Sequence, residues 1–332
     1  MIHRFCVAPM MDRTDRHERF FLRSLSKKAY LYTEMINANA VLFGDQNELL
    51  KFNECEHPLA IQLGGNDPIK LSEAATISES YGYDEINLNI GCPSNKVQSG
   101  NFGAILMNKP NLVAKCVKAI KNKVNIPVSV KCRIGVDDMD EEKDLNTFIK
   151  KVSDSGCKIF IVHARKAWLK GLSPRENRNI PPLNYERVYK LKDEFPHLEI
   201  IINGGLETIE DSKNHLTKVD GVMMGRKAYE NPFQLTKVDH LFYGMPFLSK
   251  TRKEVLLRMI PYIIQQHKAG IKINLISRHF MGLTKGTRFA KQIRANLTNL
   301  NALKEPEKKL SLIHISEPTR PLYISYAVFC LK

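Results

Sequence analysis

The chain alternates short apolar, β-branched runs with amphipathic helical stretches over about its first 225 residues. Helical stretches at 68–80, 112–121 and 144–153 lie between such runs. Regular alternation of strand and helix is typical of parallel βαβ units. Eight units in this length favour a closed (β/α)8 barrel. The expected strands are 5–8, 30–35, 59–63, 85–90, 128–132, 159–162, 199–202 and 221–224.

A doubly wound parallel sheet is the alternative architecture for this pattern. That fold usually has fewer strands and a glycine-rich first turn. The turn after the first expected strand is Pro9-Met10-Met11-Asp12, which contains no glycine. We therefore expect an α/β protein whose residues 1–244 form a (β/α)8 TIM barrel.

The pattern changes from about residue 245. Segments 252–266 and 288–300 are predicted to be helical, and no convincing strand accompanies them. The formal net charge of +15 is unevenly distributed: residues 1–244 carry 34 Lys and Arg against 31 Asp and Glu, whereas residues 245–310 carry 14 against 3. We expect 245–310 to form a small, basic, all-helical domain, for which a polyanion is the natural partner.

The final stretch, 311–332, fits neither pattern. Its Glu317-Pro318-Thr319-Arg320-Pro321 sequence interrupts any helix, and the apolar run 323–331 has neither a helical period nor a strand partner. We expect a tail that is non-native or disordered and that belongs to neither domain.

The seven cysteines are scattered, and no CxxC pair occurs. Neither a disulfide framework nor a zinc site is indicated, so a reducing, cytoplasmic compartment and no bound metal are expected. The N-terminal sequence does not have the character of a signal peptide. No apolar run reaches the roughly 18 residues that span a bilayer, so no membrane association is expected.

The sequence at the strand ends predicts where a site lies. In barrels of this kind, catalytic side chains come from the C-terminal ends of the strands. The seventh and eighth strands end in Asn203-Gly204-Gly205 and Gly225-Arg226. Glycine-rich turns at these two ends indicate a phosphate site, because backbone N–H groups there meet an anion closely. Arg226 would add a charge-assisted contact.

Three other strand ends carry reactive groups. Cys92 lies in the turn Gly91-Cys92-Pro93 after the fourth strand, which brings a lone thiol to the barrel mouth. Lys131 suits either a Schiff-base nucleophile or a cation beside an electron-rich cofactor ring. His163 suits a general base, a cofactor contact or a buried structural histidine. The residues alone leave these alternatives open.

Several separate segments of the chain resemble the family of tRNA-dihydrouridine synthases, and they occur in the same order as in that family. The similarity is closest to the A subfamily and extends to about residue 305. Arg13 departs from the pattern, since many A-type members have an aromatic residue there. The similar segments are Ala8–His17, Asn87–Ser94, Val97-Gln98, Phe102–Ala104, His163–Trp168, Leu172–Arg178 and Met224–Tyr229.

The resemblance implies an oxidoreductase that reduces the C5–C6 double bond of uridines 20 and 20a in the tRNA D-loop, with FMN as cofactor and NADPH as reductant. Hydride passes from reduced FMN to C6, and Cys92 donates a proton to C5. A thiol with an ordinary pKa of about 8.5 is protonated at neutral pH and suits this role. Asn89 is expected to hold the uracil edge.

The resemblance also implies which residues contact the flavin and the tRNA. Under it, Lys131 is a cation beside the flavin ring that adjusts the electronic properties of the ring. The implied flavin-binding residues are Pro9, Met10, Met11, Gln62, Lys131, His163, Asn203, Gly204, Gly205, Gly225 and Arg226. The target base must be extruded from the folded tRNA, which requires the protein to bind the RNA backbone firmly. The expected tRNA contacts are Arg175, Arg178, Arg288, Lys291 and Arg294.

Two alternatives remain at this point. One is a small-molecule flavoenzyme of the dihydroorotate or dihydropyrimidine type, which has no need of a basic helical domain. The other is a non-catalytic RNA-binding protein on a barrel scaffold. The charge of residues 245–310 favours RNA as the partner, and we expect a monomer.

Overall fold

The computed structural model describes residues 2–287, 290–291 and 294. The chain divides between Ser249 and Lys250 into two compact units. Within the described residues, no helix combines the length and apolar character that crossing a membrane requires.

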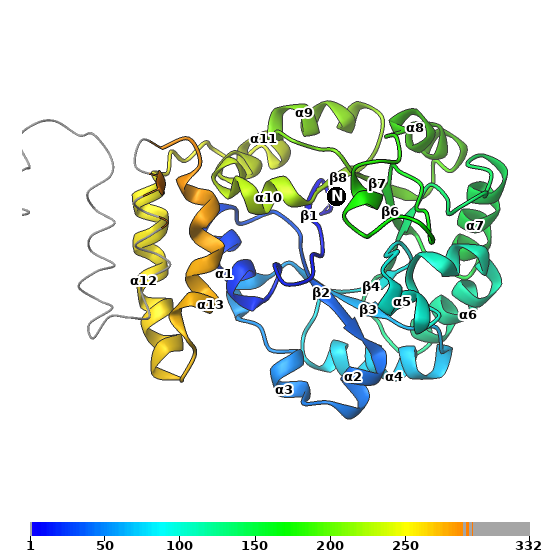
Figure 1. Ribbon diagram of the computed structural model, residues 1–332, viewed down its shortest axis with the longest axis horizontal. Coiled ribbons are helices and arrows are strands. Elements are labelled where there is room, and N and C mark those ends of the chain that lie inside the picture. The colour runs from blue at the N-terminus through cyan, green and yellow to red at the C-terminus, as the bar shows by residue number, and fades with distance from the viewer. Residues whose placement is uncertain (1, 288–289, 292–293, 295–332) are drawn as a thin grey trace, which may run out of the picture. The chain divides into compact units, whose positions relative to one another are not determined.

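The first unit is a barrel of eight parallel strands surrounded by helices (Figure 1). The strands are hydrogen-bonded in the order β1-β8-β7-β6-β5-β4-β3-β2, and a backbone bridge between Cys6 and Tyr30 connects β1 to the start of β2. The expected TIM barrel is confirmed. The strands are β1 (Phe5–Val7), β2 (Leu31–Asn37), β3 (Leu59–Gly64), β4 (Glu85–Asn89), β5 (Val128–Arg133), β6 (Ile159–His163), β7 (Glu199–Asn203) and β8 (Gly221–Met224).

Local sequence signals mark where helices of this unit begin. Helix α4, for example, begins at Pro68, and the Asp67 carboxylate accepts hydrogen bonds from the first free N–H groups. The helices are α1 (Arg16–Leu25), α2 (Ala38–Phe43), α3 (Gln46–Leu49), α4 (Pro68–Ser80), α5 (Asn95–Ser99), α6 (Pro110–Lys121), α7 (Lys143–Asp154), α8 (Tyr185–Glu194), α9 (Ile209–Asn214), α10 (Arg226–Glu230) and α11 (Val238–Tyr243). The 3-10 turns are η1 (Glu54–Glu56), η2 (Gly103–Asn108), η3 (Glu176–Arg178), η4 (His215–Thr217) and η5 (Pro232–Lys237).

A column of buried polar side chains crosses between strands β4, β5 and β7. The Asn87 amide donates to Ser129 Oγ at 2.6 Å, and the Ser129 hydroxyl donates to Glu85 at 2.5 Å. The His3 ring lies 2.7 Å from the other Glu85 oxygen and 2.9 Å from Glu199. Because these buried groups satisfy one another, the column avoids the cost of unpaired polar atoms in a core.

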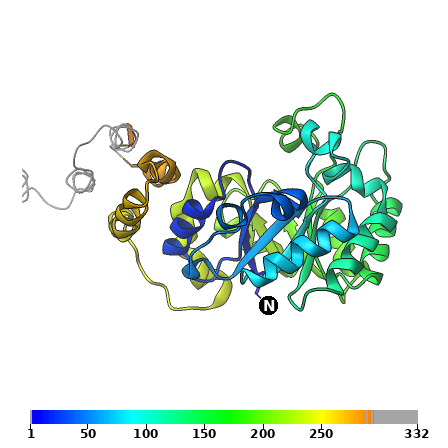
Figure 2. The ribbon, with the colours of Figure 1, turned by 90° about the horizontal axis from the view of Figure 1, so that it is seen from below.

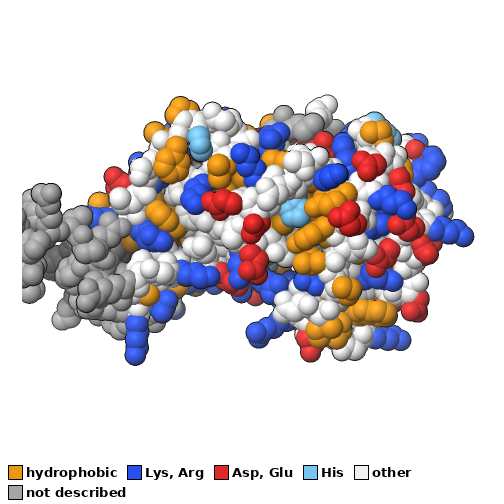
Figure 3. Space-filling model, turned by 90° about the horizontal axis from the view of Figure 1, so that it is seen from above, with side chains coloured by type: hydrophobic (Ala, Val, Ile, Leu, Met, Phe, Trp, Pro, Cys, Tyr) orange, Lys and Arg blue, Asp and Glu red, His pale blue; other side chains and the backbone are white. Residues whose placement is uncertain are grey.

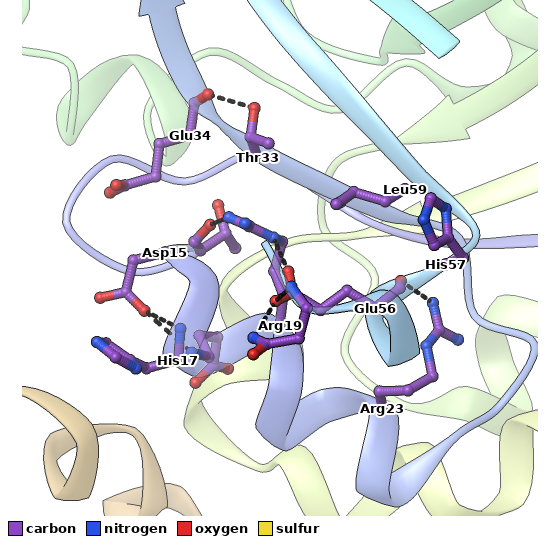
Figure 4. Close-up of polar contacts among 12 residues, drawn as sticks. Asp15, His17, Arg19, Arg23, Thr33, Glu34, Glu56, His57 and Leu59 are labelled. Atoms are coloured by element: carbon purple, nitrogen blue, oxygen red, sulfur yellow. Dashed lines mark hydrogen bonds and ion pairs between the residues drawn. The ribbon is translucent and has the colours of Figure 1, made fainter. Parts of the chain in front are cut away.

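Buried arginines of α1 fix the turn that follows β1 (Figure 4). Arg19 donates to the Glu56 carboxylate at 2.7 Å and to the Thr14 carbonyl at 2.8 Å. Arg23 donates to the Glu56 carbonyl at 2.8 Å. The Thr14 hydroxyl accepts from the Met10 N–H at 2.9 Å. This chain of contacts connects η1 to the first turn of the barrel mouth.

The second unit is helical in its described part. It contains α12 (Arg252–Lys268), α13 (Ile273–Ser277) and the 3-10 turn η6 (Arg278–Thr284). Thr251 and Glu254 form a capping box at the start of α12. Its buried apolar side chains are Val255, Leu256, Met259, Tyr262, Ile263, Ile273, Ile276, Phe280 and Leu283.

Candidate active site at the barrel mouth

The inward face of the strands leads directly to the candidate site. Ile161 and Ile201 belong to the buried apolar cluster between the strands. Side chains two positions apart on a strand share a face, so His163 and Asn203 extend the same face toward the strand ends. The same alternation applies to β3, β4 and β5. The residues that form this layer are Gln62, Asn89, Lys131, His163 and Asn203.

Asn89 shapes the turn that carries Cys92. Its side-chain oxygen accepts hydrogen bonds from the N–H groups of Gly91 at 3.2 Å and Cys92 at 3.0 Å. Its side-chain amide donates to the Gln62 oxygen at 2.8 Å. Asn89 therefore orients the turn through both the oxygen and the nitrogen of its side-chain amide. The Cys92 side chain, which is half-buried, projects from this turn.

The segment after Cys92 returns to it through Gly103. The Cys92 carbonyl accepts from the Ala104 N–H at 2.9 Å. Gly103 has φ of 77°, and a Cβ atom there would lie 2.6 Å from the Cys92 carbonyl oxygen and 2.3 Å from Val97. Only glycine permits this close return, so Gly103 keeps the loop closed over the Cys92 backbone.

Two ionisable groups of the inward layer have strongly shifted pKa values. Burial, with the nearby positive charge of Arg133, lowers the pKa of Lys131 to about 8. Burial also lowers the pKa of His163 well below its ordinary value, and the charges of Arg133 and Lys131 act in the same direction. His163 is therefore neutral at pH 7. Within the described residues, the Lys131 amine has no hydrogen-bond or ion-pair partner.

Arg133 joins the loops around Cys92. Its guanidinium donates to the carbonyl oxygens of Gly91 at 3.1 Å, Lys166 at 2.9 Å and Asn177 at 2.9 Å. These acceptors follow β4 and β6. Figure 2 shows the segments after these two strands projecting together from one end of the barrel. The sequence did not reveal this role of Arg133, because its partners are distant in sequence.

The glycines at the ends of β7 and β8 differ in how closely their neighbours pack. Gly204 has φ of 111°, and a Cβ atom there would lie 2.6 Å from the His163 ring. At Gly205, with φ of 68°, a Cβ atom would lie 2.4 Å from Leu183. A Cβ atom at Gly225 would meet only Ala8, at 3.8 Å. Both Gly204 and Gly205 are thus required by neighbouring side chains, whereas Gly225 has room beside it.

Four other predicted flavin contacts, Pro9, Met10, Met11 and Asn203, lie after β1 or at the end of β7. The Asn203 amide donates to the Met223 carbonyl at 2.7 Å, which connects the ends of β7 and β8. The Ala8 N–H donates to the Met224 carbonyl at 2.8 Å, so the turn after β1 begins beside the end of β8. In that turn Pro9 and Met10 are half-buried, and Met11 is exposed.

Four arginines form a cationic cluster, which we define as Arg13, Arg175, Arg178 and Arg226. Burial and then the charges of Arg226 and Arg13 lower the pKa of Arg178, with Arg175 acting in the same direction. Arg226 donates to the Arg178 carbonyl at 3.4 Å, and the Arg13 guanidinium lies 4.9 Å from the centre of the Tyr229 ring. In the described part of the chain, none of the four forms an ion pair. The cluster therefore attracts anions.

The predicted contacts of the second unit are only partly described. Lys291 and Arg294 are exposed helical residues, and Arg294 donates to the Thr284 hydroxyl at 3.3 Å. Arg288 lies outside the described residues. The basic second unit contrasts with the barrel, over which Figure 3 shows acidic and basic side chains interspersed.

Comparison with known proteins decides the family. The family described as "Dihydrouridine synthase (Dus)" matches residues 6–318. This chain belongs to the dihydrouridine synthase family. Among curated relatives of this dihydrouridine synthase, a tRNA-dihydrouridine(20/20a) synthase from Synechocystis sp. is 53% identical over 302 residues, which cover 91% of this chain and 90% of the relative. A protein of the same name from Escherichia coli K12 is 52% identical over 296 residues, covering 89% and 86%.

A solved structure shares the fold of this dihydrouridine synthase. The old yellow enzyme homologue from Zymomonas mobilis superposes with a TM-score of 0.53 over 76% of this chain and 92% of that chain. The two sequences are 12% identical, so the likeness concerns the barrel alone. The resemblance drawn from the motifs is confirmed at the level of the family.

Proposed function

We propose that this dihydrouridine synthase reduces uridines 20 and 20a of the tRNA D-loop to dihydrouridine, with bound FMN and with NADPH as reductant. The observation that carries the proposal is the half-buried thiol of Cys92, held by Asn89 at the end of β4 beside Lys131 on β5. The relatives' printed names, tRNA-dihydrouridine(20/20a) synthase, support the choice of positions.

The residues at the mouth suit a flavin phosphate cofactor. Lys131 supplies a positive charge without a counter-ion in the described chain, as an electron-rich ring requires. The lack of a side chain at Gly225, where a Cβ atom would contact only Ala8, suits close approach of a phosphate to the backbone, and Arg226 forms no ion pair with any described residue. We propose Lys131, Gln62 and His163 for the ring, with Asn203, Gly204, Gly205, Gly225 and Arg226 for the phosphate and Pro9, Met10 and Met11 for the turn that lines it.

The chemistry that bound, reduced FMN would supply in the proposed reaction is a hydride for C6 of the uracil ring. Cys92 gives its thiol proton to C5, so one hydride and one proton saturate the C5–C6 bond, and the thiolate regains a proton from solvent. Asn89 holds the turn that aims the thiol, and we propose that its amide also lies at the uracil edge. Neutral His163 offers one donor and one acceptor without adding charge beside Lys131.

The proposed RNA contacts follow the distribution of charge. Arg175 and Arg178 belong to the cationic cluster, and the charge of Cys92 in its thiolate form would be felt at Arg178. This proximity to Cys92 supports Arg178 as a contact to the phosphates beside an extruded uridine. We propose Arg288, Lys291 and Arg294 as further backbone contacts from a tRNA-binding domain over 245–310. We further propose that the enzyme acts as a cytoplasmic monomer.

Incubation of the purified, yellow protein with NADPH and an unmodified tRNA transcript tests the proposal. Mass mapping of nuclease fragments should show a gain of two hydrogens at positions 20 and 20a. Uracil and orotate, each with a C5–C6 double bond to reduce, serve as alternative substrates in parallel reactions. Turnover of either small molecule without modification of the tRNA would replace the proposal with a dihydropyrimidine-type flavoenzyme.

A further inference from the structure

Trp168 is an exposed aromatic residue on a rigid loop beside the candidate site. It is the only tryptophan of the chain, and 40% of its surface is exposed. Single exposed apolar residues are common on protein surfaces and need no explanation by themselves. What distinguishes Trp168 is how firmly its backbone is held and what surrounds it.

The buried side chain of Asn177 binds both backbone groups of Trp168. The Trp168 N–H donates to the Asn177 side-chain oxygen at 2.7 Å, and the Asn177 amide donates back to the Trp168 carbonyl at 2.9 Å. The same amide donates to the Leu172 carbonyl at 3.1 Å. A polar side chain with no exposed surface therefore fixes the backbone from which the exposed ring projects.

The same loop is fastened to the segment that carries Cys92. The Gln98 amide donates to the Pro93 carbonyl at 2.8 Å and to the Leu169 carbonyl at 2.9 Å. Arg133 donates both to the Gly91 carbonyl and to the Lys166 carbonyl, two residues before Trp168. The backbone that carries the indole is thus held at a set position relative to the Cys92 turn.

The loop that carries the indole is rich in basic residues, and the acid that contacts it beside Trp168 is Asp137, whose carboxylate accepts from the Leu169 N–H at 2.8 Å. The segment 164–180 contains Arg165, Lys166, Lys170, Arg175 and Arg178 but a single acid, Glu176. The Lys166 ammonium lies 5.9 Å from the centre of the indole ring. Fixed aromatic faces within positive surroundings are the combination that binds single-stranded nucleic acid, since every base has a π face.

We propose that Trp168 is a stacking platform for an unpaired base of the tRNA that neighbours the target uridine. The inference rests on the proposed function for its choice of RNA. Extruding a uridine breaks its stacking with adjacent bases, and the indole offers a replacement surface for one of them. Trp168 then holds the opened D-loop while Cys92 reaches the extruded uridine.

The fluorescence of the single tryptophan tests the stacking directly. In the FMN-bound protein without NADPH, excitation at a wavelength that avoids tyrosine reports Trp168 alone. Unmodified tRNA should quench its emission and shield it severalfold from acrylamide. Heparin, a polyanion without bases, should occupy the basic surface and leave the emission and the acrylamide quenching unchanged. Equal effects of heparin and tRNA, or no effect of tRNA, would overturn the proposal.

Binding of tRNA to variants supplies a second measurement. Trp168→Leu should raise the dissociation constant about 5- to 150-fold, the loss expected for one base–aromatic stack. Trp168→Phe should stay within a few-fold of wild type. The control is Phe195→Leu, because Phe195 follows α8 and precedes β7, at the opposite end of the barrel. Equal affinity of Trp168→Leu and wild type would refute the stack.

The two proposals fail in different ways. If wild type forms dihydrouridine and Trp168→Leu binds tRNA normally, the stack is wrong and the proposed function stands. If wild type forms no dihydrouridine but tRNA quenches Trp168 while heparin does not, the function is wrong and the RNA platform stands. Mass mapping and fluorescence on the same preparation separate these results.

Discussion

At the scale of single residues, the contacts of Asn89 indicate a role in holding the Cys92 turn, whereas the motifs implied a contact with the uracil edge. Both lone pairs of its side-chain oxygen are engaged by the N–H groups of Gly91 and Cys92, and one amide hydrogen by Gln62. Among the described residues the other amide hydrogen has no partner, which leaves it for a substrate. Asn89 is therefore first a residue that positions the Cys92 turn, and its contact with uracil stays a prediction.

Replacing Asn89 should slow catalysis more than it weakens tRNA binding. Asn89→Ala removes two acceptor contacts of about 1 kcal/mol each, so we expect kcat to fall by about tenfold or more with a nearly unchanged KM for tRNA. Asn89→Asp keeps an oxygen for both N–H groups and should recover part of the rate. A wild-type kcat for Asn89→Ala in steady-state kinetics would disprove the positioning role.

The lowered pKa of Lys131 makes FMN binding depend on pH. Burial and Arg133 lower the pKa to about 8, so the amine is charged below that pH and neutral above it. The charged form attracts an electron-rich ligand. The FMN dissociation constant, measured by fluorescence titration, should therefore rise above about pH 8. Lys131→Arg stays charged and should show no bend there. The same bend in both proteins would exclude Lys131 as its cause.

At the scale of elements, the strands were predictable and the connections between loops were not. The ends of most expected strands lie within one residue of the observed ends, because β-branched apolar runs mark buried strands. The exception is β2, which ends at Asn37, two residues after the expected end. Helix α5 is five residues long, too short for a helical period. The contacts of Arg133 join residues 33 to 44 positions apart in sequence, so no local pattern reveals them.

The polar column adds a pH-dependent contribution to the stability of the barrel. Burial alone would lower the pKa of His3, but hydrogen bonds with Glu199 and Glu85 outweigh it and raise the pKa to about 9. A raised folded-state pKa stabilises the fold fully below about pH 6.5, and this contribution disappears as pH rises through about 9. It connects β4 and β7 to the segment before β1.

Urea unfolding at pH 6.5 and pH 9.5 checks this contribution. Wild type should lose up to about 3 kcal/mol of unfolding free energy over this range relative to His3→Gln, since a shift of one pKa unit corresponds to about 1.4 kcal/mol. His3→Gln keeps hydrogen-bonding capacity but cannot titrate. Parallel pH profiles for the two proteins would show that His3 does not change its charge on folding.

At the scale of the whole molecule, the segment proposed to bind tRNA is strongly basic, whereas the barrel with the candidate active site is nearly balanced in charge. The barrel sequence is nearly balanced, with 34 Lys and Arg against 31 Asp and Glu in 1–244, while 245–310 has 14 against 3. Composition alone indicated this division. The cationic cluster did not follow from composition, because its members come from the turns after β1, β6 and β8 and are brought together only by the barrel.

The dependence of tRNA binding on salt measures how many phosphates the cluster neutralises. Replacing Arg175 and Arg178 together by Gln should weaken binding of every tRNA and reduce the slope of log K against log salt by about 1 for each phosphate that is no longer neutralised. FMN content, measured from visible absorbance, should stay at the wild-type level. An unchanged slope would place the RNA backbone elsewhere on the protein.

Cys92 is the centre of the proposed mechanism, as the proton donor of a tRNA-modifying reduction. Mass mapping of tRNA treated with NADPH and either wild type or Cys92→Ala tests this role most directly. Wild type should place dihydrouridine at positions 20 and 20a. Cys92→Ala should keep its FMN and its affinity for tRNA and form dihydrouridine at least about a hundredfold more slowly, the effect of removing a general acid. Dihydrouridine formation by Cys92→Ala at the wild-type rate would contradict the proposed role of the thiol.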